Sequence, residues 1–269
     1  MPGPKAVLLE ALRERMAAFD PAPTLSSPAT SPQGFLAVPP GYLHEIFAPT
    51  RMDTGAALGF ALGQARTFLS PERPGVLVLQ LRSELQEAGV PYAPGISGFG
   101  LEPDHVTFVQ AESVTELLWA LEEELACRAV GTVIADFAHP HKALDFTASR
   151  RLSLRAADSG VSVFLLSVSK AREASAARYR WRIAPILSRT MPFDARAPGP
   201  PRWRVVLEKG QVRAGRPAGA EGETYLVDWT GNGFALADIG SKERPRIIPG
   251  AAIPGAISAV LGDRLSQAG

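Results

Sequence analysis

The chain has 269 residues, of which 46% are hydrophobic and 20% charged, and its formal net charge is +1. This composition excludes intrinsic disorder, collagen and coiled coil, and it can fill one packed α/β domain with short extensions. A single cysteine, Cys127, excludes an internal disulfide and a cysteine-based zinc site. Without a membrane-length apolar run or a recognisable signal peptide, we expect a cytoplasmic protein with no membrane partner.

Charge is distributed unevenly along the chain. Residues 83–127 contain nine acidic residues and no Lys or Arg, whereas residues 142–216 contain sixteen Lys and Arg against five Asp and Glu. We therefore expect a molecule that is electrically polarised along its sequence.

Two segments precede the predicted main domain. An amphipathic helix is predicted within residues 1–19, because apolar side chains recur there at three- and four-residue spacing: Leu8, Leu12, Met16 and Phe19. Six prolines among Ser, Thr and Gly predict a linker over residues 20–40. The main domain is expected at residues 41–240 and a C-terminal tail at residues 241–269.

The main domain begins with short apolar runs that alternate with helical patterns, which is typical of parallel βαβ units. The predicted strands are Leu43–Phe47, Val76–Leu81, Val106–Val109, Val130–Ala135 and Val161–Val168. The predicted helices are Met52–Leu69, Ser113–Cys127 and Leu144–Ser159. Because several strands are almost continuously apolar, we expect an α/β fold whose mainly parallel sheet is flanked by helices.

Past residue 170 the apolar period changes to two, which predicts antiparallel strands added at the C-terminal side of the sheet. The pattern places arginines on one face and aromatic side chains on the other: Arg178, Arg180, Arg182, Arg202 and Arg204. If the two arginine segments pair, they form a basic ribbon that attracts DNA phosphates or an acidic partner. Alternatively, the arginines pair with the acidic segment 84–124 of the same chain or of a neighbour. A glycine-rich hairpin is predicted further on, between Glu223–Trp229 and Phe234–Ile239.

The turn after the first predicted strand is where a nucleotide-binding fold holds its phosphate loop. Residues 48–55 read Ala-Pro-Thr-Arg-Met-Asp-Thr-Gly, without the glycines and lysine that cradle phosphates, and Asp53 would oppose phosphate binding. Glu84 and Asp136 follow strands at positions where such a fold activates water and holds magnesium. Without a phosphate loop we interpret both as remnants or strand-end caps, and we expect neither nucleotide hydrolysis nor a cofactor.

Two further features carry weaker chemistry. His139 and His141 stand close together in a loop after a strand, but no carboxylate or cysteine pattern accompanies them, so no metal site is expected. Cys127 ends an amphipathic helix beside Arg128, and we expect it to pack as a small buried apolar residue rather than to react.

Several segments in order resemble the ImuA family, which are RecA-like accessory proteins of damage-inducible mutagenesis. The segments that carry the resemblance are residues 43–48, 92–106, 117–123, 145–152, 177–183 and 199–205. They include Tyr-Ala-Pro-Gly from residue 92, Ala-Arg-Tyr-Arg-Trp-Arg-Ile from residue 177 and Gly-Pro-Pro-Arg-Trp-Arg-Val from residue 199. The resemblance spans roughly residues 41–229.

The resemblance implies a RecA-like core that works beside an ImuB-type Y-family polymerase relative and an error-prone C-family DNA polymerase. The implied function is that of an adaptor in SOS-induced translesion synthesis, at the bacterial nucleoid when DNA is damaged. RecA and single-stranded DNA are further candidate partners, and by similarity to RecA the apolar stripe of the N-terminal helix is a candidate docking element. The alternative is that this stripe packs on the protein's own core.

Compared with RecA, Glu84 falls near the catalytic glutamate and Asp136 near the Walker B aspartate, whereas Walker A has no counterpart in residues 48–55. The resemblance therefore predicts a protein that is not an enzyme. The alternatives are a DNA-stimulated ATPase with an atypical phosphate loop and an inhibitor that caps RecA filaments.

Overall fold

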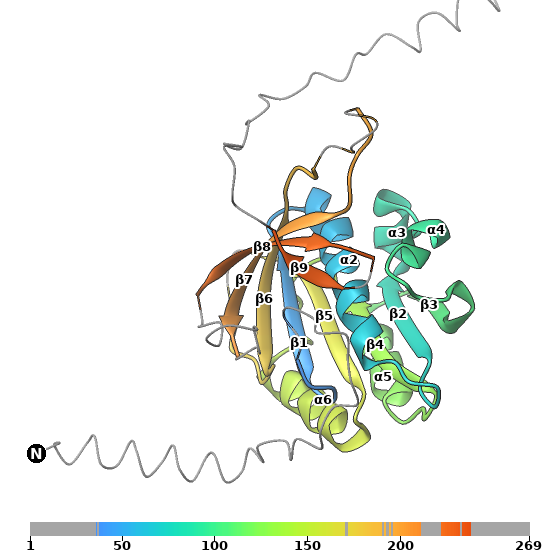
Figure 1. The fold of residues 1–269 in the computed structure, drawn as a ribbon. Coiled ribbons are helices and arrows are strands. Elements are labelled where there is room, and N and C mark those ends of the chain that lie inside the picture. Colours follow the sequence, from blue (N-terminus) through green and yellow to red (C-terminus); the bar gives the residue numbers. More distant parts are fainter. Residues whose placement is uncertain are drawn as a thin grey trace, which may run out of the picture.

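The computed structural model describes residues 36, 38–169, 172–189, 191, 194, 196–210, 222–231 and 233–237. These residues form a nine-stranded sheet in the order β3-β2-β4-β5-β1-β6-β7-β8-β9 (Figure 1). The predicted N-terminal helix with its apolar stripe and the predicted C-terminal tail lie outside the described residues. At the end of the predicted linker, Leu36 and Val38 are buried in the core cluster around helix α2 (Thr54–Ala65).

The first half of the sheet confirms the predicted parallel strands. They are β1 (Leu43–Ala48), β2 (Gly75–Leu81), β3 (Val106–Ala111), β4 (Val130–Asp136) and β5 (Ser162–Val168). Each pairs in parallel with its neighbours in this half. β4 is buried throughout except at its last residue, as expected for a strand that has helices on both faces.

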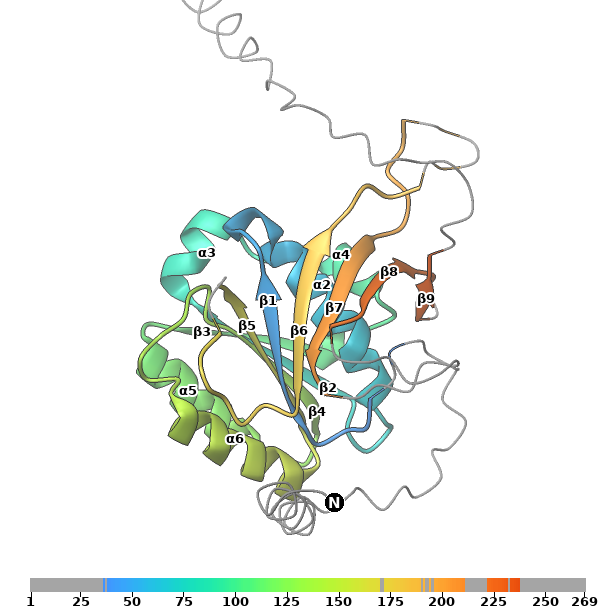
Figure 2. The ribbon, with the colours of Figure 1, turned by 90° about the vertical axis from the view of Figure 1, so that its left-hand side faces the viewer.

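Helices pack on both faces of this parallel half. The three long helices are α2 (Thr54–Ala65), α5 (Val114–Glu124) and α6 (Phe146–Ser159). α2 covers one face, and α5 and α6 lie side by side on the other (Figure 2). The caps of α6 follow from its sequence, because Asp145 accepts a hydrogen bond from Ala148 N at 2.8 Å and Gly160 takes the left-handed conformation after the last turn.

The structure corrects one predicted helix and adds short helical elements. The predicted helix 52–69 is an α-helix only over α2, with 3-10 turns at Arg51–Asp53 and Arg66–Phe68. The short elements α3 (Arg82–Ala88), α4 (Ala93–Ser97) and η3 (Pro103–His105) had no predicted counterpart. They are too short to show a helical apolar period, so the sequence pattern does not reveal them.

The second half of the sheet consists of β6 (Tyr179–Pro185), β7 (Arg202–Lys209), β8 (Thr224–Trp229) and β9 (Phe234–Leu236). β7, β8 and β9 are antiparallel additions, as predicted, and β8 and β9 form the predicted hairpin. β6 differs from the prediction because it runs parallel to β1. The segment after β5 returns the chain to the amino end of β1, where Arg178 N donates to Leu43 O at 2.9 Å, so antiparallel pairing begins only at β7.

Aromatic side chains join this half to α2. Trp181, Trp203 and Trp229 belong to the same buried cluster as Phe60 of α2, while the alternate positions of β6 and β7 carry four of the five predicted arginines and the fifth directly precedes β6. Figure 1 shows β6 to β9 continuing the sheet beyond β1. β6 and β7 therefore bury one face against α2 and place the arginines on the other.

Candidate functional site

Two sequence-predicted residues come together at the carboxyl edge of the parallel strands. Asp136 is the last residue of β4, and Glu84 lies in the first turn of α3, directly after the neighbouring strand β2. Burial raises the pKa of Asp136, and the charge of Glu84 adds to the rise, whereas hydrogen bonds and Arg51 oppose it. One of these hydrogen bonds comes from Ala138 N at 3.0 Å.

Arg51, which sequence reasoning did not assign to this site, joins the same cluster from the turn after β1. Its guanidinium donates to Glu84 Oε2 at 2.6 Å, and the Glu84 side chain is 23% exposed. This turn is the predicted position of a phosphate loop. Its arginine therefore binds Glu84, the residue predicted near the position of a catalytic glutamate. The sequence pattern could not predict this contact, because it joins Arg51 to a residue 33 positions later in the chain.

The remaining polar groups of this turn bind each other. Thr50 donates to Asp53 Oδ2 from both its backbone N, at 3.1 Å, and its hydroxyl, at 2.7 Å. The Thr54 hydroxyl donates to Arg51 O at 2.9 Å. Asp53 directly precedes α2, where a negative charge interacts favourably with the helix dipole. The turn is therefore organised by its own side chains, with a carboxylate at the helix N-terminus where a nucleotide-binding fold holds phosphate.

The arginine-bearing segments pair as adjacent strands. β6 and β7 are antiparallel, with Arg182 opposite Val206 and Ala184 opposite Arg204. Arg178, Arg182 and Arg204 are exposed, whereas Arg180 and Arg202 are half-buried. We call this surface, formed by the five predicted arginines, the arginine face.

Carboxylates on neighbouring strands bind three of these arginines. Arg180 pairs with Glu45 of β1 at 2.8 Å, Arg182 pairs with Glu208 of β7 at 2.9 Å, and Arg202 pairs with Asp228 of β8. None of these carboxylates lies in the acidic segment 84–124, so pairing with that segment of the same chain is wrong for these three arginines. The carboxylates of the segment bind other arginines, and Glu122, for example, binds Arg151 and Arg155.

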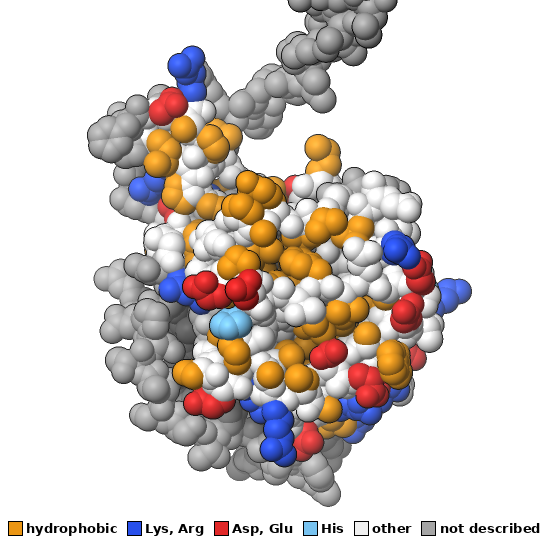
Figure 3. Space-filling view, turned by 90° about the vertical axis from the view of Figure 1, so that its right-hand side faces the viewer, with side chains coloured by type: hydrophobic (Ala, Val, Ile, Leu, Met, Phe, Trp, Pro, Cys, Tyr) orange, Lys and Arg blue, Asp and Glu red, His pale blue; other side chains and the backbone are white. Residues whose placement is uncertain are grey.

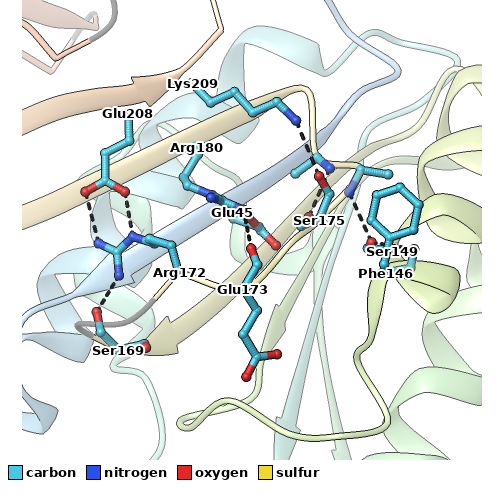
Figure 4. Close-up of polar contacts among 12 residues, drawn as sticks. Glu45, Phe146, Ser149, Ser169, Arg172, Glu173, Ser175, Arg180, Glu208 and Lys209 are labelled. Carbon is cyan, nitrogen blue, oxygen red and sulfur yellow. Dashed lines mark hydrogen bonds and ion pairs between the residues drawn. The ribbon is translucent and has the colours of Figure 1, made fainter.

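Arg172, which was not among the predicted site residues, reinforces the arginine face (Figure 4). It binds Glu208 through Nε and Nη2 at 2.6 and 3.0 Å, donates to Ser169 O, and lies 3.9 Å from the centre of the Phe47 ring. Burial alone would raise the pKa of Glu208, but Arg172 and Arg182 lower it below its usual value. Glu208 thus serves two arginines, and Asp228 serves both Arg202 and Arg189. Cations outnumber carboxylates in these pairs, which leaves the face positively charged.

The other candidate residues give no site. His139 and His141 are exposed and line a cavity of about 50 Å³ together with Glu45 and Glu173. Within the described ranges, no group of three or more His, Cys, Asp and Glu side chains is arranged to hold a metal ion. Cys127 is exposed, so its predicted burial is wrong. It lies beyond the end of α5, in the connection to β4.

The helices of the described part of the chain are all too short or too polar to span a membrane.

A mainly parallel sheet with helices on both faces and antiparallel strands added after β6 defines a protein of the α/β class. No family profile matches the sequence. The chain is 34% identical over 214 residues to Protein ImuA from two strains of Caulobacter vibrioides, and the match covers 74% of this chain and 82% of each relative. The chain belongs to the ImuA family.

The crystal structure of the RadB recombinase overlaps with a TM-score of 0.47 at 14% sequence identity, over 74% of this chain and 92% of that one.

Proposed function

We propose that the protein is a non-catalytic, RecA-like adaptor in SOS-induced error-prone translesion DNA synthesis. In this role it links an ImuB-type Y-family polymerase relative to an error-prone C-family DNA polymerase at damaged DNA. Membership of the ImuA family supports a role in damage-inducible mutagenesis. RecA and single-stranded DNA are further partners in this proposal.

The contact between Arg51 and Glu84 carries the non-catalytic part of the proposal. A general base must reach the water that it activates, at hydrogen-bond distance. Here Glu84 instead accepts a hydrogen bond from Arg51, a residue of the turn that would hold the phosphates. The hydroxyl and carboxylate of the same turn bind one another, so they are not arranged around a phosphate or a magnesium ion.

The arginine face supports contact with a polyanion or an acidic protein surface. Arg178, Arg182 and Arg204 are its exposed members, and the ion pairs of the face retain an excess of cations because Glu208 and Asp228 each bind two arginines. Phosphates or carboxylates of a partner would displace surface water and counterions rather than disrupt the core. The aromatic side chains of β6 and β7 pack against α2, so they do not provide a stacking platform for bases.

A nucleotide-binding assay tests the non-catalytic role. Purified full-length protein is titrated with a fluorescent ATP analogue and magnesium, and we expect no saturable signal. The matched variant Arg51→Ala, which frees Glu84, controls for blockage by this single side chain. Saturable binding by the wild type, with hydrolysis that DNA stimulates, would instead favour an ATPase with an atypical phosphate loop.

A DNA-binding assay tests the arginine face. Fluorescence anisotropy of labelled single-stranded DNA is measured at two salt concentrations, with and without ATP. We expect the affinity for DNA to fall as salt rises and not to depend on ATP. We also expect it to be lower in the double variant Arg178→Ala with Arg204→Ala. The exposed Arg128, which lies outside the face, provides the control Arg128→Ala. Absence of DNA binding under all conditions would restrict the face to protein partners.

A further inference from the structure

Two large apolar side chains lie in solvent on the outer face of the α5–α6 layer. Trp119 of α5 is 64% exposed and Leu154 of α6 is 63% exposed. The opposite side of each helix is already buried, through Leu117 and Leu121 on α5 and through Leu152 on α6. The exposed side chains are therefore not needed for the core, and a tryptophan on an outer helix face is a frequent anchor of protein interfaces.

The two helices carry opposite charges. α5 contains Glu116, Glu122, Glu123 and Glu124 without a Lys or Arg, and α6 contains Arg150, Arg151 and Arg155 with one acidic residue, Asp158. Glu122 binds Arg151 and Arg155 across the seam between the helices. Glu123 and Arg150 are exposed. The face thus has an acidic half with the exposed Trp119 and a basic half with the exposed Leu154, and Phe146 at the start of α6 is also 49% exposed.

The direction of the helices makes this face complementary to itself. α5 connects β3 to β4 and α6 connects β4 to β5, and these strands share one direction, so the two helices run the same way (Figure 2). A twofold axis parallel to the helices then places α5 of one copy on α6 of the other. A twofold axis perpendicular to the helices would place α5 on α5, where like charges repel.

We propose that a second copy of this chain docks on the outer face of α5 and α6, in a symmetric dimer with α5 facing α6 of the partner. The acidic residues of one helix then meet arginines of the other, and Trp119 and Leu154 are removed from water at the centre. Figure 3 views the molecule from the β3 edge and shows acidic, basic and hydrophobic side chains exposed on that side. Neither Arg51 nor Glu84 belongs to this face, so the proposal does not depend on the proposed function.

Charge reversal on full-length protein tests the dimer. Molar mass is measured by sedimentation velocity and by size-exclusion chromatography with light scattering, at protein concentrations up to about a hundred micromolar. We expect the wild type to dimerise, and we expect Glu123→Arg and Arg150→Glu each to weaken the dimer at least about tenfold. The combination of both substitutions restores complementary charges, so we expect it to recover most of the affinity.

A pair of aromatic substitutions separates the central contact from general surface effects. Trp119→Ser is expected to abolish the dimer, whereas Tyr92→Ser, at a residue that is 76% exposed outside the face, leaves it intact. Circular dichroism confirms that each variant is folded. A wild type that remains monomeric at all concentrations, or a doubly reversed variant no tighter than the single ones, would overturn the proposal.

Discussion

β4 and β7 are inner strands of the same sheet, yet their sequences follow different rules. β4 is apolar or small along almost its whole length and is buried on both faces, whereas β7 alternates Arg202, Trp203 and Arg204 and buries one face against α2. The number of faces that helices cover decides which pattern a strand needs. On the face of β7 that carries arginines, carboxylates of β7 and of adjacent strands form ion pairs with arginines. The second half of the sheet, β6 to β9, is therefore stabilised by ion pairs as well as by its core.

The largest difference in the free energy of unfolding is expected between substitutions on the two faces of β7. Trp203 is buried and its Nε1 donates to Ala56 O at 2.9 Å. Trp203→Ala should therefore lower the free energy of unfolding by about 3–5 kcal/mol. Arg204→Ala, at the exposed neighbour, should change it by less than about 0.5 kcal/mol. Urea titrations followed by circular dichroism measure both values, and similar losses would remove the distinction between the faces.

The second contrast lies within the arginine face. The side chains of Arg180 and Glu45 are 14% and 12% exposed, whereas that of Arg182 is 51% exposed. Arg180→Ala leaves Glu45 largely buried without its main partner, and we expect a loss of about 2 kcal/mol in the free energy of unfolding. Arg182→Ala should cost less than about 1 kcal/mol. A larger loss of stability in Arg182→Ala than in Arg180→Ala would contradict this prediction. It would mean that the exposed pair of Arg182 with Glu208 stabilises the fold more than the buried pair does.

The third prediction concerns His44, which joins the two halves on β1. Its Nδ1 accepts a hydrogen bond from Trp181 Nε1 at 3.3 Å, and complete burial lowers the pKa of His44 to about 3. The unfolded chain binds a proton near pH 6.5, so the folded state loses stability as pH falls from about 6.5 towards 3. The loss is at most about 1.4 kcal/mol per pH unit. His44→Asn, which retains an acceptor for Trp181, should reduce the dependence of stability on pH in this range. An unchanged dependence would mean that other titrating groups cause it.

The smallest change in stability is expected for a substitution of Asp136. Because burial raises the pKa of Asp136, its charged form is disfavoured in the folded protein relative to the unfolded chain. Asp136→Asn keeps an oxygen that accepts from Ala138 N, so we expect equal or slightly greater stability. The proposed non-catalytic role makes Asp136 a strand-end cap, so we expect the variant also to support damage-induced mutagenesis at the wild-type frequency. A folded Asp136→Asn protein that fails to support mutagenesis would contradict the non-catalytic role.

Local pattern was sufficient for the elements with a clear period. The strands β1 to β5 and the helix α6 were predictable because each is a continuous apolar run or a capped amphipathic helix. The alternation of arginine with aromatic residues predicted β6 and β7 as strands, and the structure shows that they pair. The parallel direction of β6 and the short helices α3 and α4 were not predictable, because they depend on where the chain returns rather than on periodicity.

The same division applies to the candidate sites. The residues of the turn after β1 already indicate that its phosphate-binding groups are missing, because that property depends on residue types next to each other in the chain. The binding of Arg51 to Glu84, of Arg172 to Glu208 and of Arg180 to Glu45 joins residues that are 33 to 135 positions apart. Ion pairs of this kind depend on strand order and register.

By itself, the sequence determined the fold class, the arginine pattern and the family resemblance, because periodicity, composition and motif order are local properties of a chain. Only the tertiary structure decided which carboxylates neutralise which arginines, and that an arginine lies on the glutamate at the position of a catalytic base. It also decided that the neighbouring helices α5 and α6 expose Trp119 and Leu154. Coulomb interactions and burial depend on distance in space, and the sheet sets those distances by bringing remote segments together.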